Sequence, residues 1–291
     1  MTLGLFTQIL VNGLIMGGIY AMVASGFTLT LGVVKIFNFA QGQFYMLGAY
    51  VCFGVVTALG MPYPVALLAS FVSMFLLGAL FYFGVIHKTL ASGFFHTWLI
   101  TVSFGTIIGQ GALLTFGNKA GVMPAVIEGA YNIGGVIIPQ GKLLVIGGAI
   151  IIMVALYYFM RTKIGTSMLA AAENVGVAGL MGINATQVFW VTTAVGCALC
   201  GFAGGLIAPV FAASLFMGQT ILMKALFVVM VGGMGSMSGA LIAAFLVGIA
   251  ESFGFQYVGQ WDLILIFGFI AVLLYFKPGG LIGKPLPLPG E

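Results

Sequence analysis

Residues 161–184 read Arg-Thr-Lys-Ile-Gly-Thr-Ser-Met-Leu-Ala-Ala-Ala-Glu-Asn-Val-Gly-Val-Ala-Gly-Leu-Met-Gly-Ile-Asn and separate two long apolar stretches. The segment holds three charged residues, Arg161, Lys163 and Glu173, and its Ala-rich centre favours a helix. Two glycines interrupt its far end. The pattern predicts a short polar helix between two membrane spans. Such a helix can fit a groove on a soluble partner and transmit motion into the membrane.

The composition excludes a soluble globular protein. Of the 291 residues, 62% are hydrophobic and only 5% are charged, whereas a soluble domain carries roughly 25% charged residues. So few charges cannot cover a surface that faces water, so membrane lipid must be the main solvent. The nine Lys and Arg residues form no patch, which argues against nucleic acid as a partner.

Apolar runs of spanning length recur along the chain, since a spanning helix needs roughly 20 apolar residues. The run 222–250 is interrupted by four glycines, Gly232, Gly233, Gly235 and Gly239, which predict a break between two half-length helices or a re-entrant turn, and a candidate gate. We therefore expect an all-α polytopic membrane protein, with residues 1–291 forming one transmembrane domain of eight or nine spans. The expected spans are 5–33, 39–59, 64–86, 94–116, 143–160, 188–213, 222–250 and 261–276.

The cations predict the orientation, because Lys and Arg are enriched in cytoplasmic connections. Most of them fall in connections that alternate to one side, which we assign to the cytoplasm. With the N-terminus outside, a cytoplasmic tail needs nine crossings, which favours dividing 222–250 in two. Lys119 and Lys142 lie in the opposite connection and weaken this assignment. The cations on the cytoplasmic side are Lys35, Lys88, Arg161, Lys163, Lys277 and Lys284.

The sequence predicts neither an enzyme nor a cofactor or metal site. Gly141-Lys142-Leu143 fails as a phosphate loop, because Leu stands where Ser or Thr should hold the metal. Cys197 and Cys200 form a CxxC inside an apolar run without a second ligand pair, so we interpret them as packing residues. A membrane enzyme would need clustered His, Asp or Glu. If ATP drives this protein, the ATPase is another chain.

Five segments carry further motifs, in order: 38–50 (Asn-Phe-Ala-Gln-Gly-Gln-Phe-Tyr-Met-Leu-Gly-Ala-Tyr), 173–184, 203–206, 231–240 and 278–283. Together they resemble the branched-chain amino acid ABC permease family over nearly the whole chain. The resemblance implies a permease subunit in the inner or plasma membrane of a prokaryote. It also implies a second, related permease, two cytoplasmic ATP-binding subunits and a periplasmic or lipid-anchored substrate-binding protein. Relatives in this family also carry urea or short amides.

The first of these segments supplies candidates for the cargo pathway: Asn38, Gln41, Gln43 and Tyr45. At an expected break between spans, such side chains either hydrogen-bond a passing zwitterion or satisfy free backbone groups. The family signature usually has His and an acidic residue where this chain has Gln41 and Gln43. Two titratable groups are thus replaced by neutral ones, which leaves branched-chain amino acids, urea and short amides open as cargo.

The connection of about 161–187 supplies candidates for ATPase coupling: Glu173, Asn174, Gly176 and Gly182. The residues alone leave open a solvated loop helix without a partner. The resemblance implies instead that closure of the ATPases pushes this helix and swings the bundle between outward-facing and inward-facing states.

Two charged residues, Lys224 and Glu251, bracket the glycine run, and we interpret them as interfacial rather than as a gate. An ion-coupled secondary transporter is the less favoured alternative. It would need intramembrane carboxylates and inverted repeats, and the sequence offers almost no such acid and no clear repeat.

Overall fold

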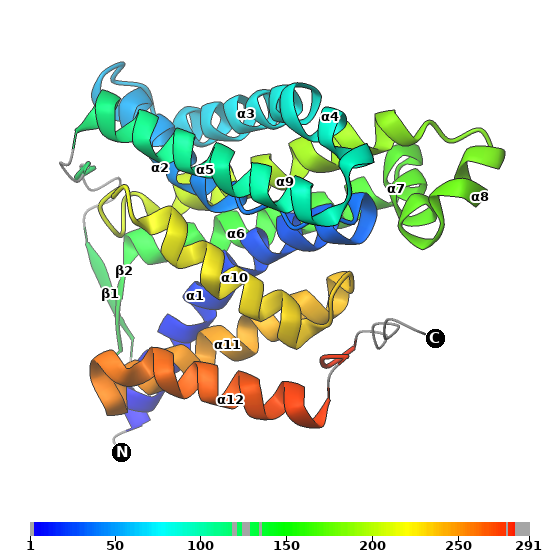
Figure 1. Cartoon of the computed structure of the whole chain (residues 1–291). Coiled ribbons are helices and arrows are strands. Elements are labelled where there is room, and N and C mark those ends of the chain that lie inside the picture. The colour runs from blue at the N-terminus through cyan, green and yellow to red at the C-terminus, as the bar shows by residue number, and fades with distance from the viewer. Residues whose placement is uncertain (1–2, 118–120, 124–128, 134–135, 278, 283–291) are drawn as a thin grey trace.

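The computed structural model describes residues 3–117, 121–123, 129–133, 136–277 and 279–282, which form a helical bundle with one small hairpin (Figure 1). π-Helical turns extend α1 through Thr30–Val34 and α3 through Tyr82–Ile86, and 3-10 turns cover Leu90–Ser92 and Gly259–Trp261. The antiparallel hairpin pairs β1 (Ala130–Ile133) with β2 (Val136–Pro139). The helices are α1 (Leu3–Leu29), α2 (Gln41–Thr57), α3 (Tyr63–Phe81), α4 (His87–Thr89), α5 (Phe94–Phe116), α6 (Gln140–Met160), α7 (Lys163–Glu173), α8 (Val175–Leu180), α9 (Ala185–Ile207), α10 (Met217–Gly232), α11 (Met237–Val258) and α12 (Asp262–Phe276).

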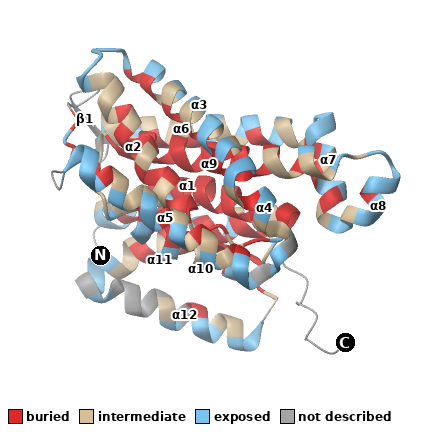
Figure 2. Cartoon of the chain, turned by 45° about the horizontal axis from the view of Figure 1, so that its top comes forward, coloured by how far each residue is buried: buried red, intermediate tan, exposed pale blue. Residues whose placement is uncertain are grey.

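Helices α1 and α9 form the centre of the bundle (Figure 2). In their most apolar stretches 83% and 89% of the residues are buried, against 17% in α5 and in α6. The outer helices expose apolar side chains, as expected where lipid rather than water is the solvent. The core is therefore built around two central helices, and α2, α3, α10 and α11 pack against them.

Close helix crossings depend on glycine, the packing device expected in lipid. A Cβ on Gly48 of α2 would overlap the backbone of Gly201 on α9, and one on Gly42 would overlap Gly218 on α10. Gly17 of α1 packs in the same way against α11. These close glycine contacts join helices within this chain's own bundle.

Six helices in the described part are long and apolar enough to cross a membrane: α1, α3 with its extension, α5, α6, α9 and α11. Helices α2, α10 and α12 are shorter, with 17, 16 and 15 residues. The prediction of a polytopic, helical membrane protein is confirmed. The small hairpin, in the connection between α5 and α6, departs from a purely α-helical fold.

One predicted span boundary was wrong, whereas the break predicted within 222–250 is confirmed, with a longer second helix than expected. The span expected at 188–213 ends at Ile207, because Pro209 follows and residues 208–211 form turns that cannot continue the helix. The run 222–250 is two helices, α10 and α11, and α11 has 22 residues rather than half a span's length. Gly233 and Gly235 adopt φ of 101° and 83°, which L side chains rarely adopt, and these angles let the chain reverse between the helices.

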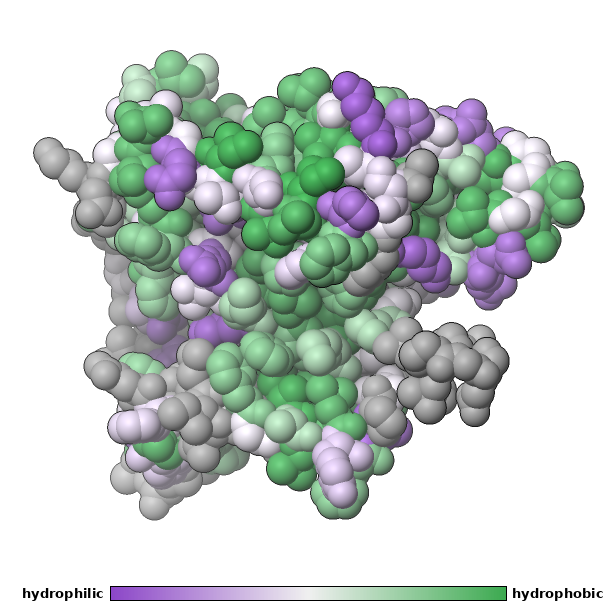
Figure 3. All heavy atoms as spheres, in the orientation of Figure 1, coloured by the Kyte–Doolittle hydropathy of each residue, from purple (hydrophilic) through white to green (hydrophobic). Residues whose placement is uncertain are grey.

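The connections sort to two ends of the molecule. Helices α4, α7 and α8 and the C-terminal segment lie at one end, whereas the hairpin and the N-terminus lie at the other (Figure 1). Hydrophilic residues gather near α7 and α8, and most of the rest of this face is hydrophobic (Figure 3). The connections that carry Lys88, Arg161 and Lys163 therefore lie at one end, as the sequence predicted, whereas Lys284 lies outside the described residues.

Candidate functional site

A cavity of about 300 Å³ opens between α1, α2, the α9–α10 loop and the start of α10. Most of its lining is apolar, and the polar exceptions include two tyrosines and one lysine. The loop that contributes Phe211 and Phe216 is held by backbone hydrogen bonds between Ala213 and Gly121. The lining residues are Met16, Tyr20, Tyr45, Ile207, Phe211, Ala212, Ser214, Phe216, Met217, Thr220, Ile221 and Lys224.

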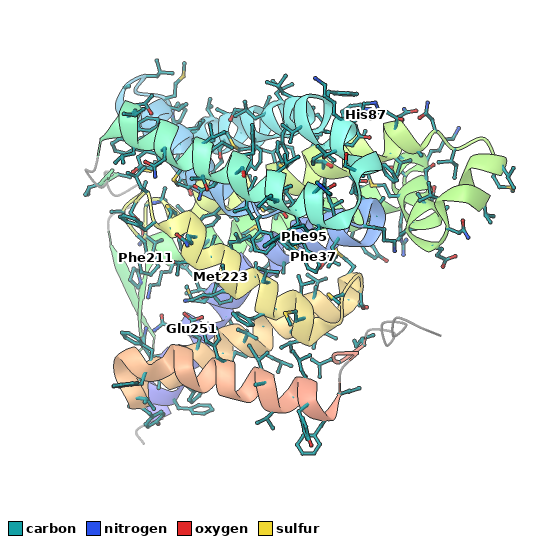
Figure 4. The ribbon with its side chains drawn as sticks, viewed as in Figure 1. Phe37, His87, Phe95, Phe211, Met223 and Glu251 are labelled. Atoms are coloured by element: carbon teal, nitrogen blue, oxygen red, sulfur yellow. The ribbon has the colours of Figure 1, made fainter. Side chains whose placement is uncertain are left out.

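Lys224 belongs to an ion pair behind this cavity. Its Nζ lies 2.5 Å from Oε1 of Glu251, and the two side chains are only 17% and 11% exposed. The Tyr20 hydroxyl donates to the other carboxylate oxygen of Glu251 at 2.5 Å and accepts from Lys224 Nζ at 3.2 Å. The network joins α1, α10 and α11, and Figure 4 labels Glu251 on α11. A single charge at a helix centre costs about 2.5–3.5 kcal/mol on insertion scales, so pairing lowers the cost of both charges.

Of the four predicted pathway residues, only Tyr45 lines this cavity. Its backbone lies so close to α9 that a Cβ on Gly204 would overlap its carbonyl oxygen. Gly204 belongs to another of the five sequence segments, so the fold brings the two segments into contact. Tyr45 therefore combines a packing position with a place in the cavity wall.

Asn38 and Gln41 are buried at the turn that leads into α2. Asn38 Oδ1 accepts from the Ala40 backbone N–H at 3.1 Å, as the backbone-satisfying interpretation predicts, while its Nδ2 has no hydrogen-bond partner among the described residues. Both polar atoms of Gln41 lack a hydrogen-bond partner there too. Its amide lies at the crossing of α1 and α9, where a Cβ on Gly26 would stand 3.0 Å from Nε2.

Gln43 faces a different neighbour, α5. A Cβ on Gly109 would stand 3.5 Å from its Oε1, and one on Gly105 would lie 3.6 Å from its Cγ. Thr101, also on α5, holds the turn before α2 through two hydrogen bonds. Its hydroxyl donates to Phe37 O and accepts from the Phe39 N–H. The three polar residues of the first segment therefore surround one turn and do not line the cavity.

The four glycines of the predicted break lie where α10 and α11 meet. Gly232 and Gly239 are in backbone contact across the turn, and Ser236 Oγ accepts from the Gly239 N–H at 3.2 Å. The segment after α12 docks here, with Leu281 N donating to Val231 O at 2.7 Å. Two of the matched sequence segments, 231–240 and 278–283, thus meet at one end of the bundle, as far as the second is described.

The predicted coupling segment is two helices rather than one. Asn174 is extended, with φ of −154°, and its Oδ1 accepts from the Val177 N–H at 3.1 Å, so that it caps α8 and ends α7. Gly182 has φ of 84° and turns the chain back toward α9. Glu173, Asn174, Gly176 and Gly182 are all exposed.

Sequence reasoning missed an exposed apolar patch on α8 and the turn after it. Val177 is 57% exposed, Leu180 is 88% exposed and Met181 is 80% exposed. Helix α8 itself lies at the end of the molecule where hydrophilic residues gather (Figures 1 and 3). Exposed apolar patches occur at sites of protein–protein or membrane interaction.

Comparison with known proteins decides the family. The family described as "Branched-chain amino acid transport system / permease component" matches residues 9–274. The chain belongs to this family. It is 30% identical to the high-affinity branched-chain amino acid transport system permease protein BraD of Pseudomonas aeruginosa, over 96% of each chain. It is 28% identical to the permease protein LivH of Escherichia coli K12, also over 96% of each. No solved structure matches.

An archaeal relative extends the family beyond bacteria. The probable branched-chain amino acid transport permease protein LivH of Methanocaldococcus jannaschii is 25% identical, over 95% of this chain and 92% of its own length. With its apolar spanning helices, this chain is a multi-pass protein of a prokaryotic cell membrane. The predicted resemblance is confirmed.

The family match does not identify the Lys224–Glu251–Tyr20 network, which sequence reasoning also missed. Tyr20 and Glu251 are 231 positions apart, and no local pattern links them. The only available signal was the rarity of charge: two of the few ionisable residues within apolar runs had opposite signs.

Proposed function

We propose that this chain is the permease subunit of an ABC importer for branched-chain or related hydrophobic amino acids. The observation that carries the proposal is membership of the family over residues 9–274, together with relatives named for branched-chain amino acid transport that align over nearly the whole chain. The cavity supports it, because its walls are mostly apolar and suit a hydrophobic side chain better than urea.

We further propose nine crossings, with α2, α10 and α12 completing the six longer helices and with the end that carries α7 and α8 in the cytoplasm. The positive-inside distribution of Lys35, Lys88, Arg161 and Lys163 supports this orientation. The shorter helices can cross because a bilayer thins locally around short spans at modest cost. Under this orientation the cavity beside the α9–α10 loop opens toward the outer half of the membrane.

We propose that α7 and α8 couple the permease to ATP hydrolysis by contacting a cytoplasmic ATP-binding subunit. The exposed apolar side chains of Leu180 and Met181 support it, because they offer a soluble partner an apolar surface outside lipid. Glu173 and Asn174 lie at the junction of the two helices and set the direction of α8. A second permease, two ATP-binding subunits and an external binding protein complete the importer.

Reconstitution tests the proposal. The chain is purified with the second permease, the ATP-binding subunits and the binding protein encoded beside it, and placed in liposomes. We expect ATP-dependent uptake and cargo-stimulated ATP hydrolysis with leucine, isoleucine or valine. Uptake of urea or short amides in place of amino acids would contradict the cargo, and uptake driven by an ion gradient without ATP would contradict the transporter class.

A further inference from the structure

Stability alone does not require an ion pair behind the cavity. Lys224 and Glu251 lie in the membrane domain with little exposure. Burying two charges carries a desolvation penalty that their attraction offsets only with excellent geometry, and apolar replacements of such pairs are often neutral or stabilising. Ionisable residues at membrane depth generally mark substrate or ion pathways. A functional role for this pair is therefore the natural expectation.

The hydrogen bonds of Lys224 leave it one donor for a ligand. An ammonium group has three N–H donors. One lies against Glu251 Oε1 at 2.5 Å and another against the Tyr20 hydroxyl at 3.2 Å. Tyr20 in turn donates to the second oxygen of Glu251 at 2.5 Å, so both carboxylate oxygens accept a hydrogen bond. The third N–H of Lys224 remains for a group in the cavity.

Of the two members of this ion pair, the cation lines the cavity and the anion does not. Lys224 and Tyr20 are among its described lining residues, whereas Glu251 is not. A ligand in the cavity therefore encounters a positive group that is fixed from behind by a carboxylate. This arrangement favours a ligand that carries a negative group, because an ammonium forms its strongest hydrogen bonds with anionic oxygens.

The rest of the cavity selects for size and apolarity. A volume of about 300 Å³ lies at the lower end of small-molecule sites and can hold a ligand of the size of one amino acid. The remaining walls are mainly methionine, isoleucine and phenylalanine side chains, which suit a branched aliphatic group. These walls are Met16, Ile207, Phe211, Phe216, Met217 and Ile221.

We propose that Lys224 binds the carboxylate of the cargo, a small hydrophobic amino acid, with Glu251 and Tyr20 as positioning residues that hold its ammonium against the cavity. The inference rests on the proposed function and deepens it, because it names the group that distinguishes amino acids from urea and amides. Neutral amides and urea offer no anionic oxygen to Lys224 and are rejected at this point.

Binding to the wild-type chain gives the first test. The full chain in lipid nanodiscs, without binding protein, is titrated with tritiated leucine, and competitors are added. We expect 4-methylpentanoate, which keeps the carboxylate, to displace leucine, and leucinamide, which lacks it, to compete at least tenfold more weakly. Equal competition by leucinamide, or no saturable leucine binding, would overturn the inference.

Variants separate a binding site from a structural ion pair. Lys224→Met is expected to weaken leucine binding by about tenfold or more, the equivalent of about 1.4 kcal/mol. The double variant Lys224→Glu with Glu251→Lys keeps opposite charges on α10 and α11 but presents a carboxylate to the cavity. We expect this double variant to be more thermally stable than Lys224→Met. We do not expect it to recover leucine binding. Recovery of leucine binding in this double variant would show that the pair is only structural.

A control is available at Lys142, a partly buried lysine in the first turn of α6. Its Nζ donates to Asn12 Oδ1 at 2.8 Å, and it does not line the cavity. Lys142→Met should leave leucine binding unchanged. In the reconstituted importer, amino acid uptake that is indifferent to Lys224→Met would refute this inference and leave the proposed function standing, whereas uptake of urea alone would refute the proposed function.

Discussion

At the scale of single residues, the sequence segment 38–50 serves packing as much as polarity. Its polar members surround a turn, and Gly42 and Gly48 are the points where α2 meets α10 and α9. Polar side chains are rare in a membrane helix, so a sequence motif there is readily interpreted through them. In this segment the glycines, which have no side chain, set how closely the helices approach. Close approach matters because lipid provides no hydrophobic driving force between helices.

Gly48→Ala should therefore destabilise the bundle. Its Cβ would overlap the Gly201 backbone, and overpacking of this kind costs about 1–3 kcal/mol. We expect a lower Tm of the purified chain in detergent and lower membrane abundance. Gly54→Ala on the same helix is the matched control, because nothing lies within 4 Å of its Cβ position. Equal loss of stability in both variants would show that helix crossing is not the cause.

A second residue-scale prediction concerns the cap of α8. Asn174→Ala removes the acceptor for the Val177 N–H, and loss of such a cap costs about 0.5–2 kcal/mol. Helix α8 has only six residues, so we expect it to fray, with faster hydrogen exchange at Val177 and severalfold slower uptake by the importer. Asn174→Asp keeps the acceptor and should behave like wild type. Slow uptake in Asn174→Asp would indicate a role for the amide itself.

At the scale of elements, the sequence predicted which segments are helical. It predicted the residues at which helices end only where strong helix-breaking residues mark those ends. The span expected at 94–116 matches α5, which Gly93 and Gly117 bound with positive φ. The span expected at 188–213 overshot, because residues 208–213 remain apolar after the helix has ended and hydropathy does not register the turn. The coupling segment was predicted as one helix, since its Ala-rich centre hides the break that Asn174 makes.

The apolar surface of α8 leads to a prediction about docking. Leu180→Asp with Met181→Asp places two charges where a soluble partner would bury apolar side chains, so binding of the ATP-binding subunits and uptake should both fall by an order of magnitude or more. Membrane abundance should stay near normal, because the change lies outside the bundle. The control is Thr166→Asp, an exposed position on α7 that adds charge without removing apolar surface. Normal co-purification of the ATP-binding subunits with the double variant would exclude this surface.

At the scale of the whole molecule, contacts between distant segments were beyond sequence reasoning. The family match covers the segments that form the cavity, yet the Lys224–Glu251 pair and the docking of Leu281 on Val231 arise only from tertiary structure. Charge sorting was predictable, because the orientation rule acts on each connection separately. Which residues pair across the bundle is not determined by the local sequence, so the structure was needed to identify the pair.

The last prediction concerns assembly. One chain contributes one α7–α8 unit, so an importer driven by two ATP-binding subunits needs two such units and therefore two permeases. The second permease is expected to be a related but non-identical chain. Native mass spectrometry of the active complex should show one copy of this chain, one of the second permease and two ATP-binding subunits. The isolated chain should hydrolyse no ATP, since Leu143 replaces the metal-binding residue of its nearest approach to a phosphate loop. An active complex with two copies of this chain and no second permease would overturn the heterodimer and would place two Lys224 cavities in one importer.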